Sequence, residues 1–179
     1  MEPFVQVLSS TPALESMVDE TAHLLKDKVM QRTEQQEMWL FKYKLTEECA
    51  TSLRKLAEEL IKANGKEIKL MLETRTDGKT WKRKPGEKPT VFSHEKGRAH
   101  IEANQIAILM LIQTRDSAVK APKLCVWDTV IRNDNSNEIE TPFGSPVLMG
   151  GPHWFETIPS AIPYMAILLH PGEETGAAT

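Results

Sequence analysis

The chain has 179 residues, a formal net charge of −3, and hydrophobic and charged fractions of 40% and 26%. This composition excludes wholesale disorder, and the length suits one sizeable domain or a helical arm joined to a compact domain. Two cysteines, Cys49 and Cys125, are too few for a disulfide framework or a four-thiolate zinc site. We therefore expect buried thiols, no metal and no other cofactor.

Membrane insertion and secretion are not indicated by the sequence. The first ten residues contain an early acid and no long apolar core, which is unlike an ordinary signal peptide. The longest apolar run, residues 106–112, is far shorter than a membrane span. We expect a cytoplasmic protein without membrane partners. The stretch KRKPGEK also resembles a weak nuclear-localisation sequence, which leaves the nucleus as an alternative.

The amino-terminal third is predicted to be mainly helical. Residues 4–7 alternate loosely and suit a short strand or a hydrophobic tail. A helix then begins at Thr11-Pro12, with Thr11 as the N-cap and Pro12 in the first turn, where its missing N–H is not needed. No glycine or proline occurs between Pro12 and Gly65, so the intervening residues favour helix.

Two geometries compete for this helical region. Residues 31–37 are all polar and interrupt the apolar face, and Thr33 with Gln36 could form a capping box that starts a second helix. Residues 38–45 also alternate in the manner of a strand. One long helix with a partner chain remains an alternative, but we favour two helices with a break near 31–46.

The second helix carries an apolar stripe with steps of three and four residues. A stripe of this kind must be covered by another helix, a sheet or a partner chain. Long amphipathic helices obtain most of their stability from partners, so we predict a coiled coil or helical pair that forms a homodimer. The candidate oligomerisation residues are Leu45, Cys49, Leu53, Leu56 and Leu60.

After Gly65, which is predicted to end the second helix, the period changes from helical to alternating. Asp77-Gly78 is a strong hairpin signal because a type I′ turn needs positive φ at both central residues. We therefore predict a hairpin and then a mainly antiparallel sheet. Its expected strands are residues 67–76, 79–84, 105–114, 124–132, 139–149 and 164–169. The run 105–114 could alternatively be a buried helix, but its β-branched residues favour a central strand with both faces covered.

These elements make an α+β protein, with helices first and strands afterwards. We predict an amino-terminal helical region over 1–66, a carboxy-terminal mainly β domain over 67–171, and a flexible tail over 172–179.

Charge is concentrated in one stretch, which we call the basic segment. Residues 75–98 contain eight basic and three acidic residues, a net charge of +5 between segments of −3 and −5. Basic side chains can neutralise phosphates, and an exposed indole can stack on a base. The candidate nucleic-acid-binding (RNA-binding) residues are Lys79, Trp81, Lys82, Arg83, Lys84 and Lys88. The alternative is an edge strand protected by lysines, with Trp81 turned into the core.

Catalytic and metal-binding patterns are weak. His94, His100, Glu102 and His153 could be combined into a metal site, but their spacing matches no metal-binding motif. Cys125 with Asp128 and a distant histidine could form a nucleophilic arrangement, yet nothing marks this thiol as activated. Ser145 lacks the second glycine of a nucleophile elbow. No catalytic residue is nominated.

Three functions follow from the sequence. The leading one is a non-enzymatic, self-associating interaction or scaffold protein. The first alternative is a nucleic-acid-binding protein that uses the basic segment on an oligomeric frame. The second alternative is an enzyme with an unrecognised site in the carboxy-terminal domain, which a closed pocket lined by His153, Asp128 or Cys125 would favour.

Overall fold

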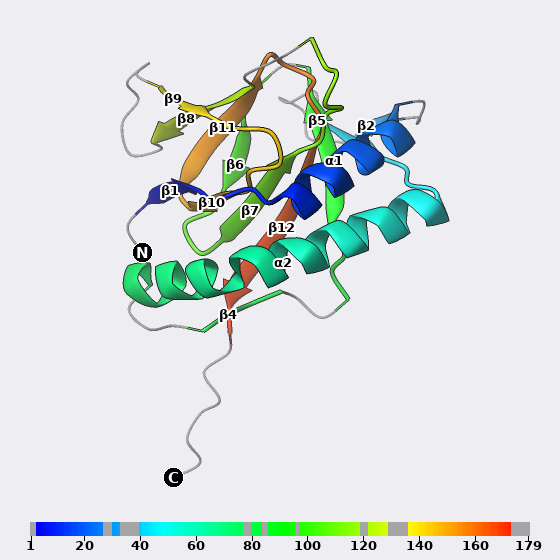
Figure 1. Ribbon diagram of the computed structural model, residues 1–179. Helices are drawn as coiled ribbons and strands as arrows, with labels where there is room; N and C mark the ends of the chain where they lie inside the picture. Colours follow the sequence, from blue (N-terminus) through cyan, green and yellow to red (C-terminus); the bar gives the residue numbers. More distant parts are fainter. Residues whose placement is uncertain are drawn as a thin grey trace.

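Two helices and two antiparallel sheets make up the part of the chain that the computed structural model describes (Figure 1). The described residues are 3–26, 30–32, 40–76, 80–83, 86–95, 97–118, 122–128 and 136–172. The capping box at Thr33 and Gln36, the Asp77-Gly78 turn and the predicted tail beyond 172 lie outside them.

Helix α1 (Pro12–Leu25) begins where the sequence predicts. The Thr11 hydroxyl oxygen accepts a hydrogen bond from the Leu14 N–H at 3.2 Å, and Pro12 occupies the first turn. This N-cap satisfies a backbone donor that the helix leaves without a partner. The face that includes Leu14 and Val18 is buried, which fixes α1 against the rest of the protein.

Helix α2 (Glu47–Arg75) is longer than predicted. It begins at an N-cap, Thr46, whose hydroxyl oxygen accepts from the Cys49 N–H at 3.3 Å. It then continues through Gly65, so the predicted C-cap at Gly65 and the predicted strand over 67–76 are wrong. Residues 67–75 also fit helical spacing. Ile68 lies on the same face as the apolar stripe and is buried, whereas Leu70 lies on another face and is 61% exposed.

The larger sheet has eight strands in the order β1-β10-β7-β12-β5-β3-β2, and β4 pairs with β12 beside this path. Its strands are β1 (Phe4–Val7), β2 (Met30–Arg32), β3 (Leu40–Tyr43), β4 (Trp81–Lys82), β5 (Thr90–His94), β7 (Ile106–Leu111), β10 (Val147–Gly150) and β12 (Tyr164–Pro171). The smaller sheet has the order β6-β11-β8-β9. Its strands are β6 (Ala99–Ile101), β8 (Lys123–Asp128), β9 (Asn137–Glu140) and β11 (His153–Ile158).

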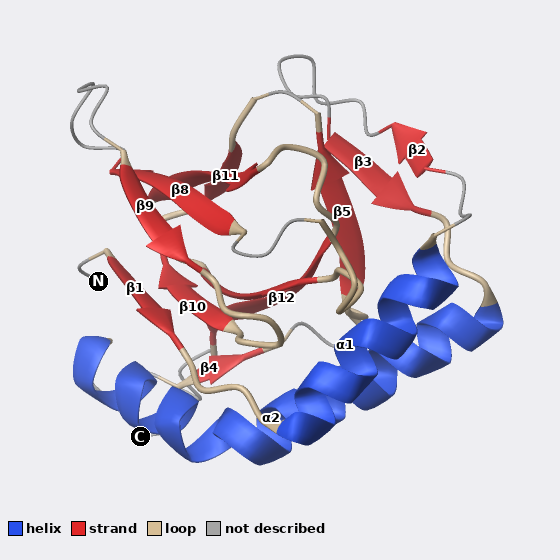
Figure 2. Cartoon of the chain, turned by 45° about the horizontal axis from the view of Figure 1, so that its top comes forward, coloured by secondary structure: helices blue, strands red, loops and turns tan. Residues whose placement is uncertain are grey.

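The strands from β5 onwards pass between two facing sheets in the order of a jelly roll. In the larger sheet β10, β7, β12 and β5 are neighbours, and β6, β11, β8 and β9 form the smaller sheet. Figure 2 shows the helices along one side of the larger sheet, with the smaller sheet on its other side. The protein is therefore α+β and mostly β.

Strand β7 is buried on both faces, as predicted for the run 105–114. Its alternate side chains enter two different cores: Ile106, Ile108 and Met110 pack with the helices. The intervening residues Ala107, Leu109 and Leu111 pack between the sheets. Because a strand turns successive side chains to opposite faces, one continuous apolar run serves both cores.

Two predicted pairings are corrected by the structure. Strand β4 pairs with the end of β12, with Trp81 opposite Pro171, and does not form a hairpin with residues 67–76. The predicted single strand over 139–149 is two strands in different sheets, β9 and β10. Between them Gly144 has a φ of 73°, a left-handed conformation that favours glycine.

The helical pair is present, but it is not a coiled coil. Helices α1 and α2 lie side by side on the larger sheet (Figures 1 and 2). The hydroxyl groups of Thr21 and Ser52 join them through a buried hydrogen bond of 2.9 Å. Helix α2 crosses the boundary predicted between residues 66 and 67, and β1 and β3 join the larger sheet. The change of spacing at Gly65 is therefore not a change of element.

Candidate functional site: a cationic groove beside helix α2

A hollow of about 510 Å³ lies between α2, strand β12 and the segment that connects β4 to β5. Its floor is apolar and includes Ala57, Ile61, Ile167 and Leu169. A volume of this size, with a mostly apolar lining and a few polar groups, is typical of small-molecule sites. We call it the first hollow.

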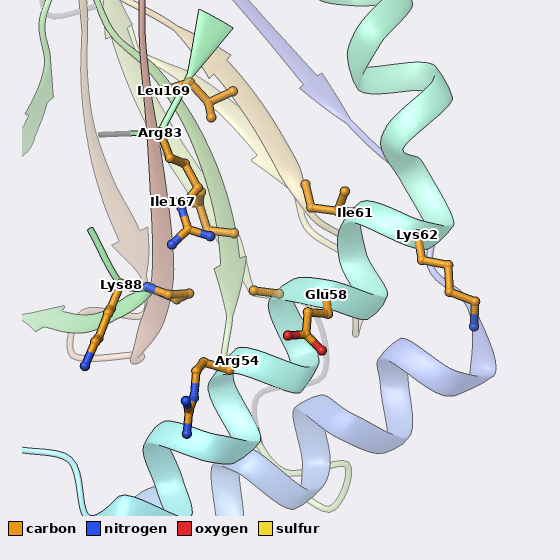
Figure 3. Close-up of a pocket in the computed structure, with 10 residues that line it drawn as sticks. Arg54, Glu58, Ile61, Lys62, Arg83, Lys88, Ile167 and Leu169 are labelled. Atoms are coloured by element: carbon orange, nitrogen blue, oxygen red, sulfur yellow. The ribbon is translucent and has the colours of Figure 1, made fainter. Parts of the chain in front are cut away.

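Four basic side chains and one acidic side chain line the first hollow, namely Arg54, Lys62, Arg83, Lys88 and Glu58. Figure 3 shows Arg83 and Lys88 on the strand side and Arg54 on the helix side. Lys62 extends away and forms an ion pair with Glu59 at 3.1 Å. Positive charge therefore predominates around the hollow, and it would attract an anion.

The positions of these cations follow from local structure. Arg54, Glu58 and Ile61 are four and three residues apart, which places them on one face of α2. On the other side, the pairing of β4 with β12 brings Arg83 beside the sheet. The Arg83 guanidinium donates a hydrogen bond to the Glu87 carbonyl, which holds the chain between β4 and β5 close to Lys88.

A second hollow of about 430 Å³ shares Ile61 and Leu169 with the first. Its lining has fewer charged side chains than that of the first hollow and includes Ile68, Leu72, Trp81, Ile108 and Gly65. At the rim, Lys69 and Glu73 face each other with an Nζ–Oε1 distance of 3.7 Å, so their charges offset one another. We call these two adjoining hollows the groove; basic side chains outnumber acidic ones by three in the first hollow and by one in the second.

The structure brings part of the predicted basic site to this groove. Arg83 and Lys88 line the first hollow, and Trp81 and Lys82 line the second. Lys79 and Lys84 lie outside the described residues. Arg54, Lys62 and Gly65 were not predicted as site residues, because nothing in the helical pattern shows that this face of α2 meets β12. Nucleic-acid binding by these residues stays a prediction.

Trp81 is half-buried and packs against the core that the helices share with the larger sheet. We expect Trp81→Ala to lower the free energy of unfolding by about 2 kcal/mol, less than for a fully buried tryptophan. The control is Lys82→Ala at the next, exposed position, which should change stability by no more than about 0.5 kcal/mol. Urea denaturation measures both. Unchanged stability together with weaker nucleic-acid binding would instead give Trp81 a stacking role.

The predicted oligomerisation residues are placed inside the chain. Cys49, Leu53, Leu56 and Leu60 are at most 1% exposed and belong to the core between the helices and the larger sheet. Leu45 is partly buried and packs against the same core. The chain's own sheet therefore covers the stripe. Dimer formation stays a prediction, but this stripe cannot be its exposed interface.

Two of the histidines considered for a metal site, His100 and His153, lie on opposite faces of the smaller sheet. His100 is exposed and its ring stacks on Trp154, with ring centroids 4.4 Å apart. His153 is buried and lies opposite Ile101, on the other face. Among the described residues, no three His, Cys, Asp or Glu side chains gather as metal ligands. The side chain of His94 is outside this description.

The space between the sheets is filled by apolar side chains such as Phe155 and Met149. Tyr164 is also buried there, and its burial raises the pKa of the phenol well above the ordinary value, so the hydroxyl stays neutral. Cys125 is buried, and neither it nor His153 lines either hollow of the groove. A pocket lined by His153 or Cys125, which would favour an enzyme with a site in the carboxy-terminal region, is thus not formed by either of the two hollows.

In the described part of the chain, neither helix has the length and hydropathy needed to cross a membrane. The chain matches no protein-family model and no curated protein sequence. A solved structure to which it is similar is the crystal structure of a Pseudomonas putida prolyl-4-hydroxylase. The two share 11% sequence identity and a TM-score of 0.48, over 94% of this chain and 91% of that chain.

The leading sequence interpretation, a non-enzymatic self-associating scaffold, is corrected. Its physical basis is removed, because the apolar stripe that called for a partner is buried against the chain's own sheet. What the structure does leave open to solvent is the groove beside α2, with its cations and its apolar floor.

Proposed function

We propose that this protein binds a small organic anion in the groove between α2 and β12. The observation that carries the proposal is the excess of basic side chains over Glu58 around an apolar floor. A carboxylate or phosphate would meet Arg54, Arg83 and Lys88, while an apolar body would cover Ile61 and Leu169.

Lys88 and Arg83 can both contact such an anion, and the Arg83 guanidinium already donates one hydrogen bond, to the Glu87 carbonyl. Both side chains are exposed, and no ion pair is found for either within the described residues. Arg54 donates a hydrogen bond to the Thr51 hydroxyl at 3.0 Å, and its ion pair with Glu47 is long, with an Nη2–Oε1 distance of 4.0 Å between two exposed side chains. Exposed ion pairs are weak, so a ligand can displace this one at little cost.

The test is a fluorescence titration with anilinonaphthalene sulfonate, which combines an apolar ring system with one negative charge. We expect Arg54→Gln and Arg83→Gln each to weaken binding about threefold, the effect of losing one partly solvated charge contact. Binding by the wild-type protein should weaken with added salt, because these charges are exposed.

The matched control is Lys55→Gln, which removes a neighbouring exposed charge of α2 that does not line the groove. It should leave the affinity unchanged. Equal effects of Lys55→Gln and Arg54→Gln would show that the probe responds to overall charge, and would contradict binding in the groove.

A further inference from the structure

We infer that the anion is the head group of a single-chain amphiphile whose alkyl chain extends from the first hollow into the second. The inference rests on the proposed function and adds the ligand class. The two hollows adjoin at Ile61 and Leu169, and both have apolar lining that an alkyl chain could cover. They differ in charge, because four basic side chains and Glu58 line the first, whereas two basic side chains and Glu73 line the second.

The charges at the second hollow support an uncharged occupant there. Lys69 and Glu73 are paired with each other, which leaves Lys82 as the one unpaired basic residue among those that line it. Apolar surface is presented there by Ile61, which is 48% exposed, and by the partly exposed Leu72 and Trp81. An alkyl chain would gain from each methylene that it removes from water at this surface.

Gly65 is the residue that leaves room for the chain. A glycine inside a helix is destabilising relative to alanine. A glycine in the middle of α2 therefore suggests that a side chain is unfavourable at this position for another reason. A Cβ atom added there would come within 4 Å of only one atom, Ile61 Cγ2 at 3.7 Å. The helix surface at Gly65 is therefore open toward the second hollow, and a larger side chain would enter it.

The experiment measures displacement of anilinonaphthalene sulfonate by saturated straight-chain carboxylates of increasing length. For wild type, affinity should rise by about fourfold per methylene, equivalent to about 0.8 kcal/mol, until the chain fills the second hollow. Gly65→Leu should abolish the gain for the longer chains and leave the shortest chain unaffected. Arg83→Gln should weaken every chain length by the same factor.

Two further variants keep the test independent of folding defects. Ala63→Leu adds the same side chain at an exposed position of α2 outside the groove, and should leave the chain-length series unchanged. Ile61→Trp enlarges a 48% exposed side chain where the hollows meet, and should shorten the longest chain that still gains affinity. Thermal melting confirms that each variant is folded.

The possible failures are distinguishable. Affinity that depends on Arg83 but not on chain length would overturn the amphiphile and leave the proposed anion site standing. Loss of any dependence on Arg54 and Arg83 would overturn the proposed function itself. Displacement of the probe by a single-stranded oligonucleotide, but by no carboxylate, would assign the cations to nucleic acid. A dimer in light scattering that dissociates as carboxylate binds would assign the groove to a second copy of the chain.

Discussion

Replacing Leu56 by alanine is expected to lower the free energy of unfolding by about 2–5 kcal/mol. Leu56 is fully buried and belongs to the core between α2, α1 and the larger sheet. The loss combines the transfer of the removed methyl groups with the cost of the cavity left behind. Chemical denaturation followed by circular dichroism gives the change directly.

The same helix supplies a matched control for this substitution. Leu70 is 61% exposed, so Leu70→Ala should change the free energy of unfolding by no more than about 0.5 kcal/mol. If Leu56→Ala left stability unchanged and only altered the molecular mass in light scattering, Leu56 would face a partner chain. The intramolecular packing of the stripe would then be wrong.

The second large effect is expected at Gly151, in the loop between β10 and β11. A Cβ atom added there would lie 2.0 Å from the Glu102 carbonyl oxygen and 2.7 Å from that of Ile101. Both are backbone atoms, so no flexible side chain can move aside. We expect Gly151→Ala to cost about 3 kcal/mol or more, because the two loops must separate.

That separation would also lengthen the hydrogen bond from the Gly151 N–H to the Gln105 carbonyl, which measures 3.0 Å. Urea denaturation of Gly65→Ala provides the comparison. At Gly65 the added methyl group has room and lies inside a helix, so stability should rise by about 1 kcal/mol. Opposite signs for the two substitutions are the expected result. A neutral Gly151→Ala would mean that the loops do not approach so closely.

Side-chain pattern alone anticipated several elements correctly. Thr11 and Pro12 identified the start of α1 because N-capping uses only adjacent residues. The run 105–114 indicated a doubly covered strand because both of its faces are apolar, and β7 is such a strand. Burial of the α2 stripe was also implied, since apolar side chains at helical spacing must be covered by something.

The length of α2 shows where a pattern misleads. Residues 67–76 alternate between apolar and polar side chains, which favoured a strand, but Ile68 also continues the helical stripe. In the folded protein Ile68 joins the core, and Leu70 remains exposed on the opposite side of the helix. The same residues fit both the period of a strand and the period of a helix, and packing against the larger sheet favours the helix.

The chain by itself determined that the α2 stripe and the run 105–114 must be covered, where α1 begins, and that positive charge gathers over 75–98. Only the tertiary structure shows that β4 pairs with β12 and that α2 packs against this sheet. The groove depends on this pairing and packing, because Arg54, Arg83 and Leu169 come from segments far apart in the chain. Capping and periodicity are local interactions, which adjacent residues specify. Pairing between distant segments depends on the packing of the whole core, so no short stretch of sequence encodes it.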